Sequence, residues 1–323
     1  MNYQTDAPQP VREFLVYHDT IKGQSHATVD SYYLDLRTFT RYMLLIRGRV
    51  PRDTLLEDID IRPADLALYG SVTVAEIYDF LAFLSRDRGL NAASRARMIT
   101  SLRGFYNYLT VKTKQLETNP VQDLDTPKLK KSLPHYLSLE ESRRLLAAVE
   151  GKNAERDYCI LCLFLNCGLR ISEMVGLNLT SIRQDSLIIH GKGNKERVVY
   201  LNDASAKALN SWLAVRKNIA AIDKNALFLS SRRKRMSVDS VQVMVKKNLL
   251  RAGLDPSQYS PHKLRHTAAT LMLENGVDIR TLQELLGHES LNTTQIYTHV
   301  ANSKLKSAAM ANPLADYEPR EKQ

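Results

Sequence analysis

The chain has 323 residues, 44% of them hydrophobic, which is enough for two globular domains of ordinary composition. Its net charge is +10, and residues 126–323 carry +11 of it against −1 for residues 1–125, so a phosphate-rich partner and a merely soluble basic surface explain the charge equally well. With no run of about 18 apolar residues and no basic start followed by an apolar stretch, the sequence predicts no membrane span, no secretory signal and a cytoplasmic location.

Residues 10–112 show apolar positions at helical spacing without strand-like alternation, which predicts a small helical bundle. The predicted helices are residues 11–18, a helix capped by Thr28 that reaches Leu45, a helix behind the capping box Thr73–Glu76, and a helix from Asn91 or Ser94 to Leu109. Arg95, Arg97 and Arg103 lie on the last helix. A DNA backbone and solvent are equally good partners for them on spacing alone.

A linker is predicted at 119–135, because three prolines interrupt any helix there. Its Lys128, Lys130 and Lys131 are positive and suited to crossing DNA. The predicted domains are therefore 1–118, a helical domain, and 136–323.

The second half mixes helices with two β-branched runs, 186–190 and 197–201, that predict a hairpin with a glycine-bounded turn. A capping box at Ser138–Glu141 opens this half. The predicted helices are residues 159–165, 171–177, 204–217, 238–251, 264–275 and 278–286. The fold class predicted is mainly α with a small antiparallel sheet.

Three cysteines lie within nine residues, at Cys159, Cys162 and Cys167. Cys-x-x-Cys raises the question of zinc or redox chemistry. The run is apolar, however, and has no histidine or second cysteine pair nearby, so we interpret all three as buried core residues. We expect no metal site.

Five short motifs carry side chains suited to cutting a phosphodiester without metal. Guanidinium groups match phosphate oxygens, neutral imidazole accepts protons near pH 7, and tyrosine can form a covalent phosphate ester. The residues are Arg170 in Cys-Gly-Leu-Arg-Ile-Ser-Glu, Lys192 in Gly-Lys-Gly-Asn-Lys-Glu-Arg, His262 and Arg265 in His-Lys-Leu-Arg-His, His288 after Leu-Gly, and Tyr297 in Thr-Thr-Gln-Ile-Tyr-Thr-His.

Several of these residues have plainer interpretations. Glu173 follows Arg170 by one helical turn and either orients catalytic side chains or is an ordinary surface carboxylate. Lys195 competes with Lys192 in the same turn. His266 is interpreted as a structural residue that points away from the site.

These motifs, in this order and spacing, resemble the tyrosine recombinase (phage integrase) family, most closely its Xer-type bacterial members. The resemblance implies an N-terminal helical core-binding bundle that clamps DNA, with Arg95, Arg97 and Arg103 facing the DNA backbone, and a C-terminal catalytic domain. It makes Tyr297 the nucleophile of a 3′-phosphotyrosine, Lys192 the general acid, His262 the group that assists proton transfer, and His288 a donor to phosphate. Bond energy is retained covalently, so no cofactor is implied.

The family resemblance also implies partners and an assembly. The partner is double-stranded DNA with paired recombination sites, held by a homo- or hetero-tetramer, and residues 300–323 pack on a neighbouring protomer or, alternatively, on their own domain. The reaction passes through a Holliday junction and serves chromosome dimer resolution or mobile-element integration and excision. The rival functions are a type IB topoisomerase-like enzyme and a catalytically silent DNA-binding regulator.

Overall fold

The structure is a computed structural model that describes residues 2–127, 135–191 and 196–287. Its contacts divide the chain into two compact units, Met1–Lys131 and Ser132–Gln323. In the part of the chain that the structure describes, no helix is both long and apolar enough to cross a membrane.

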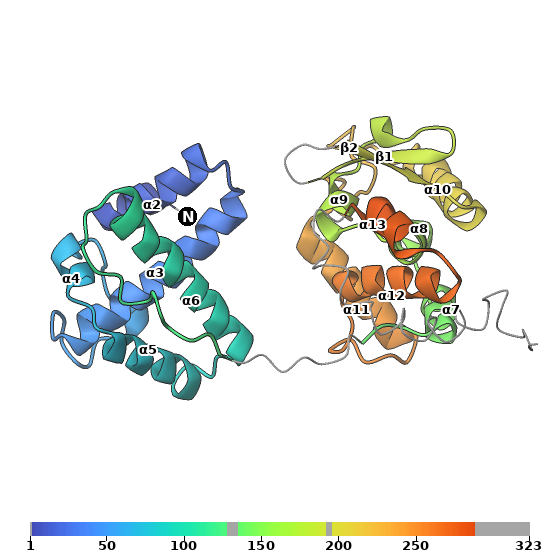
Figure 1. The fold of residues 1–323 in the computed structure, drawn as a ribbon. Helices are drawn as coiled ribbons and strands as arrows, with labels where there is room; N and C mark the ends of the chain where they lie inside the picture. Colours follow the sequence, from blue (N-terminus) through green and yellow to red (C-terminus); the bar gives the residue numbers. More distant parts are fainter. Residues whose placement is uncertain (1, 128–134, 192–195, 288–323) are drawn as a thin grey trace, which may run out of the picture. The chain divides into compact units, whose positions relative to one another are not determined.

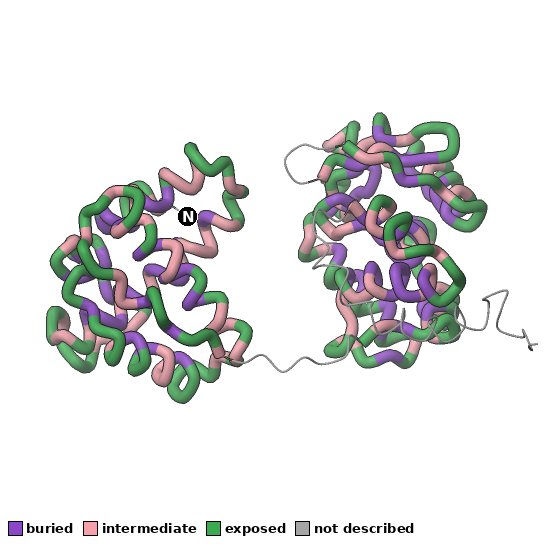
Figure 2. Tube along the Cα trace, viewed as in Figure 1, coloured by how far each residue is buried: buried purple, intermediate pink, exposed green. Residues whose placement is uncertain are grey.

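The first unit is a helical bundle around one apolar core (Figures 1 and 2). The core includes Phe14, Phe39, Phe80 and Phe105, all fully buried. The α-helices are α1 (Tyr3–Asp6), α2 (Gln9–Val16), α3 (His26–Ile46), α4 (Leu66–Gly70), α5 (Val74–Arg86) and α6 (Ala92–Asn107). Between or after them lie the π-helices η1 (Tyr17–Ile21) and η3 (Tyr108–Lys112) and the 3₁₀ turn η2 (Leu56–Asp58).

Helix starts in this unit follow the capping chemistry of the sequence, with one correction. The capping box of Thr73 and Glu76 is confirmed at α5, and Asn91 rather than Ser94 caps α6. The prediction that Thr28 caps α3 is wrong. Ser25 holds that position, because its side chain accepts a hydrogen bond from the Thr28 backbone N–H and the helix begins one turn earlier.

The second unit is mainly helical with one two-stranded antiparallel sheet, as predicted (Figure 1). The strands β1 (Ser186–His190) and β2 (Glu196–Tyr200) pair with Ile188 opposite Val198. The helices are α7 (Leu139–Ala147), α8 (Ala154–Cys167), α9 (Ile171–Gly176), η4 (Leu179–Ser181), α10 (Asp203–Arg216), α11 (Val238–Arg251), α12 (Pro261–Glu274) and α13 (Ile279–Leu286). The predicted capping box of Ser138 and Glu141 is present at α7.

Helix α8 forms the centre of this unit and packs against α7, α10 and α12. Its residues from Cys159 to Leu165 are all buried, and the three cysteines are free thiols in the core, as predicted. The helix ends at Gly168, which has a φ of +60°. A Cβ there would lie 2.6 Å from Leu286 Cδ2, so the absence of a side chain lets α13 pack closely on the end of α8.

Candidate active site

Three arginines converge on the C-terminal end of α13. Arg170 donates to the Gly287 carbonyl at 2.8 Å, and Arg265 donates to the Leu286 carbonyl at 2.6 Å. Arg197 donates to the Leu285 carbonyl at 3.3 Å. The last carbonyls of a helix have no intrahelical partner and form the negative end of its dipole. These carbonyls therefore hold three cations together.

Glu173 supplies the negative charge at the centre of the cluster. Its buried carboxylate accepts from the Arg170 guanidinium at 2.9 Å and from Arg197 at 2.6 and 2.9 Å. It also lies 3.9 Å from Arg265. Burial alone would raise the pKa of Glu173, but the hydrogen bonds and charge of Arg197, with hydrogen bonds from the backbone and side chain of Arg170, hold that pKa below its ordinary value.

The two predicted catalytic arginines are held rigidly by different elements. Arg170 is the N-cap of α9, and its side chain is 39% exposed. Arg265 lies on α12, is almost fully buried, and also donates to the Gly168 carbonyl at 2.6 Å. A cationic donor whose position is fixed before a reaction stabilises developing charge without reorganisation. The arrangement is thus suited to a phosphoryl group that approaches the exposed face of Arg170.

His262 lies in the first turn of α12, three residues before Arg265. Burial, followed by the nearby charges of Arg265 and Arg170, lowers the pKa of His262 below its ordinary value. The imidazole is therefore neutral at pH 7 and able to accept a proton.

The interpretation of His266 as pointing away from the site is wrong. Its Nε2 lies 3.0 Å from Nε2 of His262, and the two rings are almost perpendicular. The reason is helical geometry, because residues four apart on one helix lie on the same face.

Arg197 is a site residue that the sequence analysis missed. It was read only as the start of a β-branched strand, yet its guanidinium forms a bidentate pair with buried Glu173. Gly287 leaves room for it, since a Cβ at Gly287 would lie 3.0 Å from Arg197 Cδ. The one available signal was an arginine on a short strand next to the glycine-bounded turn, which does not identify a partner 24 residues away.

The remaining predicted catalytic residues lie outside the described residues, as do the predicted linker lysines and the predicted protomer-exchange segment. They are Lys192, His288, Tyr297, Lys128, Lys130, Lys131 and residues 300–323. The described chain ends at Gly287, which precedes His288 in the sequence.

The three arginines predicted to face DNA all have partners within the first unit. Arg97 pairs with buried Asp35 at 2.6 Å while its side chain stays 51% exposed. Arg95 donates to the Leu90 carbonyl at 2.6 Å. Arg103 donates to the carbonyl of Leu124. Their contact with DNA stays a prediction.

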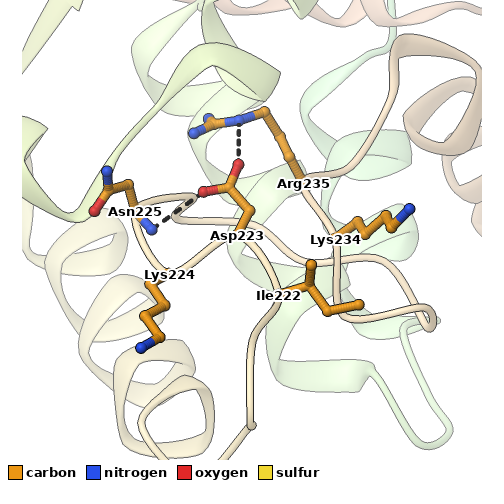
Figure 3. A pocket seen from close by; sticks show the side chains of 6 residues that line it. All are labelled: Ile222, Asp223, Lys224, Asn225, Lys234 and Arg235. Atoms are coloured by element: carbon orange, nitrogen blue, oxygen red, sulfur yellow. Dashed lines mark hydrogen bonds and ion pairs between the residues drawn. The ribbon is translucent and has the colours of Figure 1, made fainter.

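A shallow surface pocket in the second unit is lined by residues of the segment between α10 and α11, among them Asp223 and Arg235 (Figure 3). These two side chains hold the segment in place. Arg235 pairs there with Asp223 at 3.0 Å. The same guanidinium donates to the carbonyls of Val175 and Leu177, each at 3.0 Å. Arg235 therefore links the segment that contains Asp223 to the C-terminal end of α9, the helix whose N-cap is Arg170. Within the described ranges, no group of three or more possible metal-ligating side chains is found.

Comparison with known proteins identifies the class. The model of the phage integrase family matches residues 135–304, and the chain belongs to this family of tyrosine recombinases. Tyrosine recombinase XerC of Caldanaerobacter subterraneus subsp. tengcongensis is 50% identical over 95% of this chain and 88% of its own.

Two solved structures share the fold. The XerH site-specific recombinase bound to a palindromic difH substrate in a post-cleavage complex has a TM-score of 0.69, with 21% identity over 93% of this chain and 84% of the other. A lambda integrase tetramer bound to a Holliday junction has a TM-score of 0.64, with 19% identity over 88% and 75%.

Proposed function

We propose that this chain is a site-specific DNA recombinase that cuts and rejoins strands through a 3′-phosphotyrosine. The observation that supports this most directly is the pair of arginines, Arg170 and Arg265, fixed on the end of α13 immediately before the sequence segment that contains His288 and Tyr297. Membership of the tyrosine recombinase family supports the same function.

The proposed reaction uses each side chain for one task. Arg170 and Arg265, with His288, bind the phosphoryl oxygens as charge grows on them, and Glu173 with Arg197 orients both arginines. His262 takes the proton of the Tyr297 hydroxyl, whose ordinary pKa near 10 leaves it protonated at neutral pH. The phenolate attacks phosphorus, and Lys192 protonates the 5′ oxygen that leaves. The 5′ hydroxyl of the partner duplex later reverses these steps and joins the exchanged strand.

We propose the following organisation for the protein on DNA. Residues 1–118 bind the duplex as a core-binding domain, residues 119–135 are the linker, and residues 136–323 are the catalytic domain. Arg95, Arg97, Arg103, Lys128, Lys130 and Lys131 contact the DNA backbone. Four subunits hold two duplexes, as in the lambda integrase tetramer bound to a Holliday junction, and residues 300–323 pack on the neighbouring protomer.

The proposal is tested by finding the DNA that the protein cuts. Purified protein is incubated with fragmented bacterial genomic DNA, covalent adducts are trapped with detergent, and the attached DNA is sequenced. A recombinase yields one short sequence, and a plasmid that carries two copies of it recombines. Relaxation of any supercoiled plasmid without recombination would instead identify a type IB topoisomerase. The absence of any adduct on genomic DNA would favour a silent DNA-binding protein.

A further inference from the structure

His262 and His266 form a hydrogen-bonded pair on one face of α12. Their Nε2 atoms are 3.0 Å apart, their ring centroids are 4.5 Å apart, and the rings meet at 89°. An Nε2–Nε2 contact at this distance contains one hydrogen, so one ring donates and the other accepts. The direction of that bond decides which nitrogen of His262 is left with a lone pair.

Proton transfer to His262 determines which of the two histidines donates the hydrogen bond between them. A protonated imidazole carries hydrogen on both nitrogens and has no lone pair. Once His262 has taken a proton, it therefore donates at Nε2, and the 3.0 Å contact survives only if Nε2 of His266 accepts. With the opposite arrangement two hydrogens would face each other, and protonation would break the pair.

The surroundings keep His266 in the accepting form. Burial, together with the neighbouring His262, Arg265 and Lys263, lowers the pKa of His266 to about 4. Among the described residues, the charged groups that lower the pKa values of the pair are Arg265 and Lys263 of α12 and Arg170 at the start of α9. With a pKa of about 4, His266 is neutral at pH 7, so it can offer a lone pair to a cationic His262.

We propose that His266 is the positioning residue of the proton acceptor: its Nε2 accepts a hydrogen bond from Nε2–H of His262, which leaves the lone pair on Nδ1 of His262 to take the proton of Tyr297. This rests on the proposed function, in which His262 is that acceptor. The hydroxyl hydrogen of Tyr297 moves to Nδ1 of His262, and the phenolate oxygen bonds to phosphorus as the 5′ oxygen leaves. The hydrogen between the histidines stays on His262, and His266 stabilises the cation.

The first test replaces the acceptor. His266→Leu removes it, whereas His266→Gln keeps an oxygen near the position of Nε2. Covalent cleavage of a nicked suicide substrate is followed in single turnover, with protein in excess, from pH 5 to pH 9. His266→Leu should lower the plateau rate about 10- to 100-fold, the scale of a lost hydrogen bond to a charged group. His266→Gln should stay within a few-fold of the wild type.

The pH profile separates positioning from a structural role. Without its acceptor, the cation of His262 is less stable, so the pKa of His262 falls and the acid limb of the His266→Leu profile moves to lower pH. A variant that is only less well folded would lose amplitude and keep the wild-type limb. An unshifted limb in His266→Leu would overturn the proposal, as would a plateau that this variant shares with the wild type.

A second measurement needs no variant. Nitrogen-15 NMR of histidine in the wild-type protein should show hydrogen on Nε2 of His262 and on Nδ1 of His266. The reverse tautomers would overturn the proposal whether or not the Leu variant folds. A wild-type protein that forms no covalent adduct would contradict the proposed function instead, and the tautomers would still report on the pair.

Discussion

Glu173 places a single buried carboxylate between Arg170, Arg197 and Arg265, so its charge should matter both to stability and to catalysis. Glu173→Gln keeps the shape but leaves the cations without a counter-charge. Breaking a buried ion pair costs about 3 kcal/mol or more, so the melting temperature at pH 7 should fall by roughly 6 °C or more. The measurement is thermal unfolding of the full chain, with cleavage of a suicide substrate as a parallel readout.

The difference in melting temperature between the wild type and Glu173→Gln should depend on pH, because the pKa of Glu173 is lowered. The folded-state pKa lies below the ordinary 4.5, so the stabilisation is complete above pH 4.5 and is lost as the pH falls through the folded value. The gap in melting temperature between wild type and Glu173→Gln should therefore narrow as the pH falls below 4.5. A gap of equal size at all pH values would show that the charge of Glu173 contributes nothing.

If Lys192 is the general acid, a substrate with a better leaving group should compensate for its loss. An alkoxide leaves poorly without a proton, whereas a thiolate leaves readily. The slow cleavage by Lys192→Ala should therefore largely recover on a substrate whose leaving 5′ oxygen is replaced by sulfur. The measurement is the single-turnover cleavage rate of both variant and wild type on both substrates.

Arg170→Ala is the matched control for this experiment. Its cation is assigned to the phosphoryl oxygens, so cleavage should fall by at least about a hundredfold on either substrate, with little recovery from sulfur. If Lys192→Ala is equally slow on both substrates, Lys192 is a DNA-positioning charge and Lys195 becomes the residue to replace.

At the scale of residues, sequence patterns singled out Arg170, Arg265, His262 and Glu173, but not Arg197 or the contact of His266 with His262. Glu173 was recognised because it follows Arg170 by one helical turn. Arg197 was missed because Glu173, its partner, is 24 residues away in the sequence and meets it only in the folded chain. His266 was misjudged because it was considered as the neighbour of Arg265 rather than as the fourth residue after His262 on a helix. The long-range pairing of Arg197 with Glu173 leaves no local signal, whereas the spacing of the two histidines on one helix does.

At the scale of elements, the close approach of α8 and α13 depends on Gly168. Gly168→Ala places a Cβ 2.6 Å from Leu286 Cδ2 at a residue whose φ is +60°. The left-handed conformation alone costs about 1–2 kcal/mol, and the clash displaces α13 and the carbonyls that hold the arginines. Both the melting temperature and the cleavage rate should fall.

Gly176→Ala is the control for that prediction. Gly176 ends α9, and a Cβ there would meet nothing within 4 Å. Stability should change by less than about 0.5 kcal/mol, the usual range for a surface substitution. Equal melting temperatures and rates for the two alanine variants would show that the contact between α8 and α13 does not position the site.

Element boundaries were predicted well where a cap has a local chemical signature. The boxes at Thr73 and Ser138 are formed by residues three apart, so sequence alone identifies them. The predicted start of helix α3 was too late, because His26 and Ala27 do not extend the pattern of large apolar residues from which the helix was predicted. The π-helices η1 and η3 were not predicted, since apolar periodicity does not distinguish a π-turn from the α-helix that it continues.

At the scale of the whole molecule, two properties were predictable for different reasons. Helical periodicity and a short β-branched pair predicted the fold class, which the structure and its similarity to tyrosine recombinases confirm. The uneven charge was explained equally well by a polyanionic partner and by a merely soluble basic surface. Only the ordered motifs, read as a resemblance to the family, identified DNA strand exchange as the reaction.

The central claim is that Tyr297 carries the broken strand, and one measurement tests it most directly. A suicide substrate, built on the sequence recovered from genomic adducts and nicked beside the cleavage point, is incubated with wild type and with Tyr297→Phe. Products are separated on a denaturing gel, and the attached peptide is identified by mass spectrometry. The wild type should form a covalent band with a 3′-phosphate on Tyr297, and Tyr297→Phe should bind the same DNA without forming a band. A covalent band from Tyr297→Phe, or an adduct on another residue, would contradict the account.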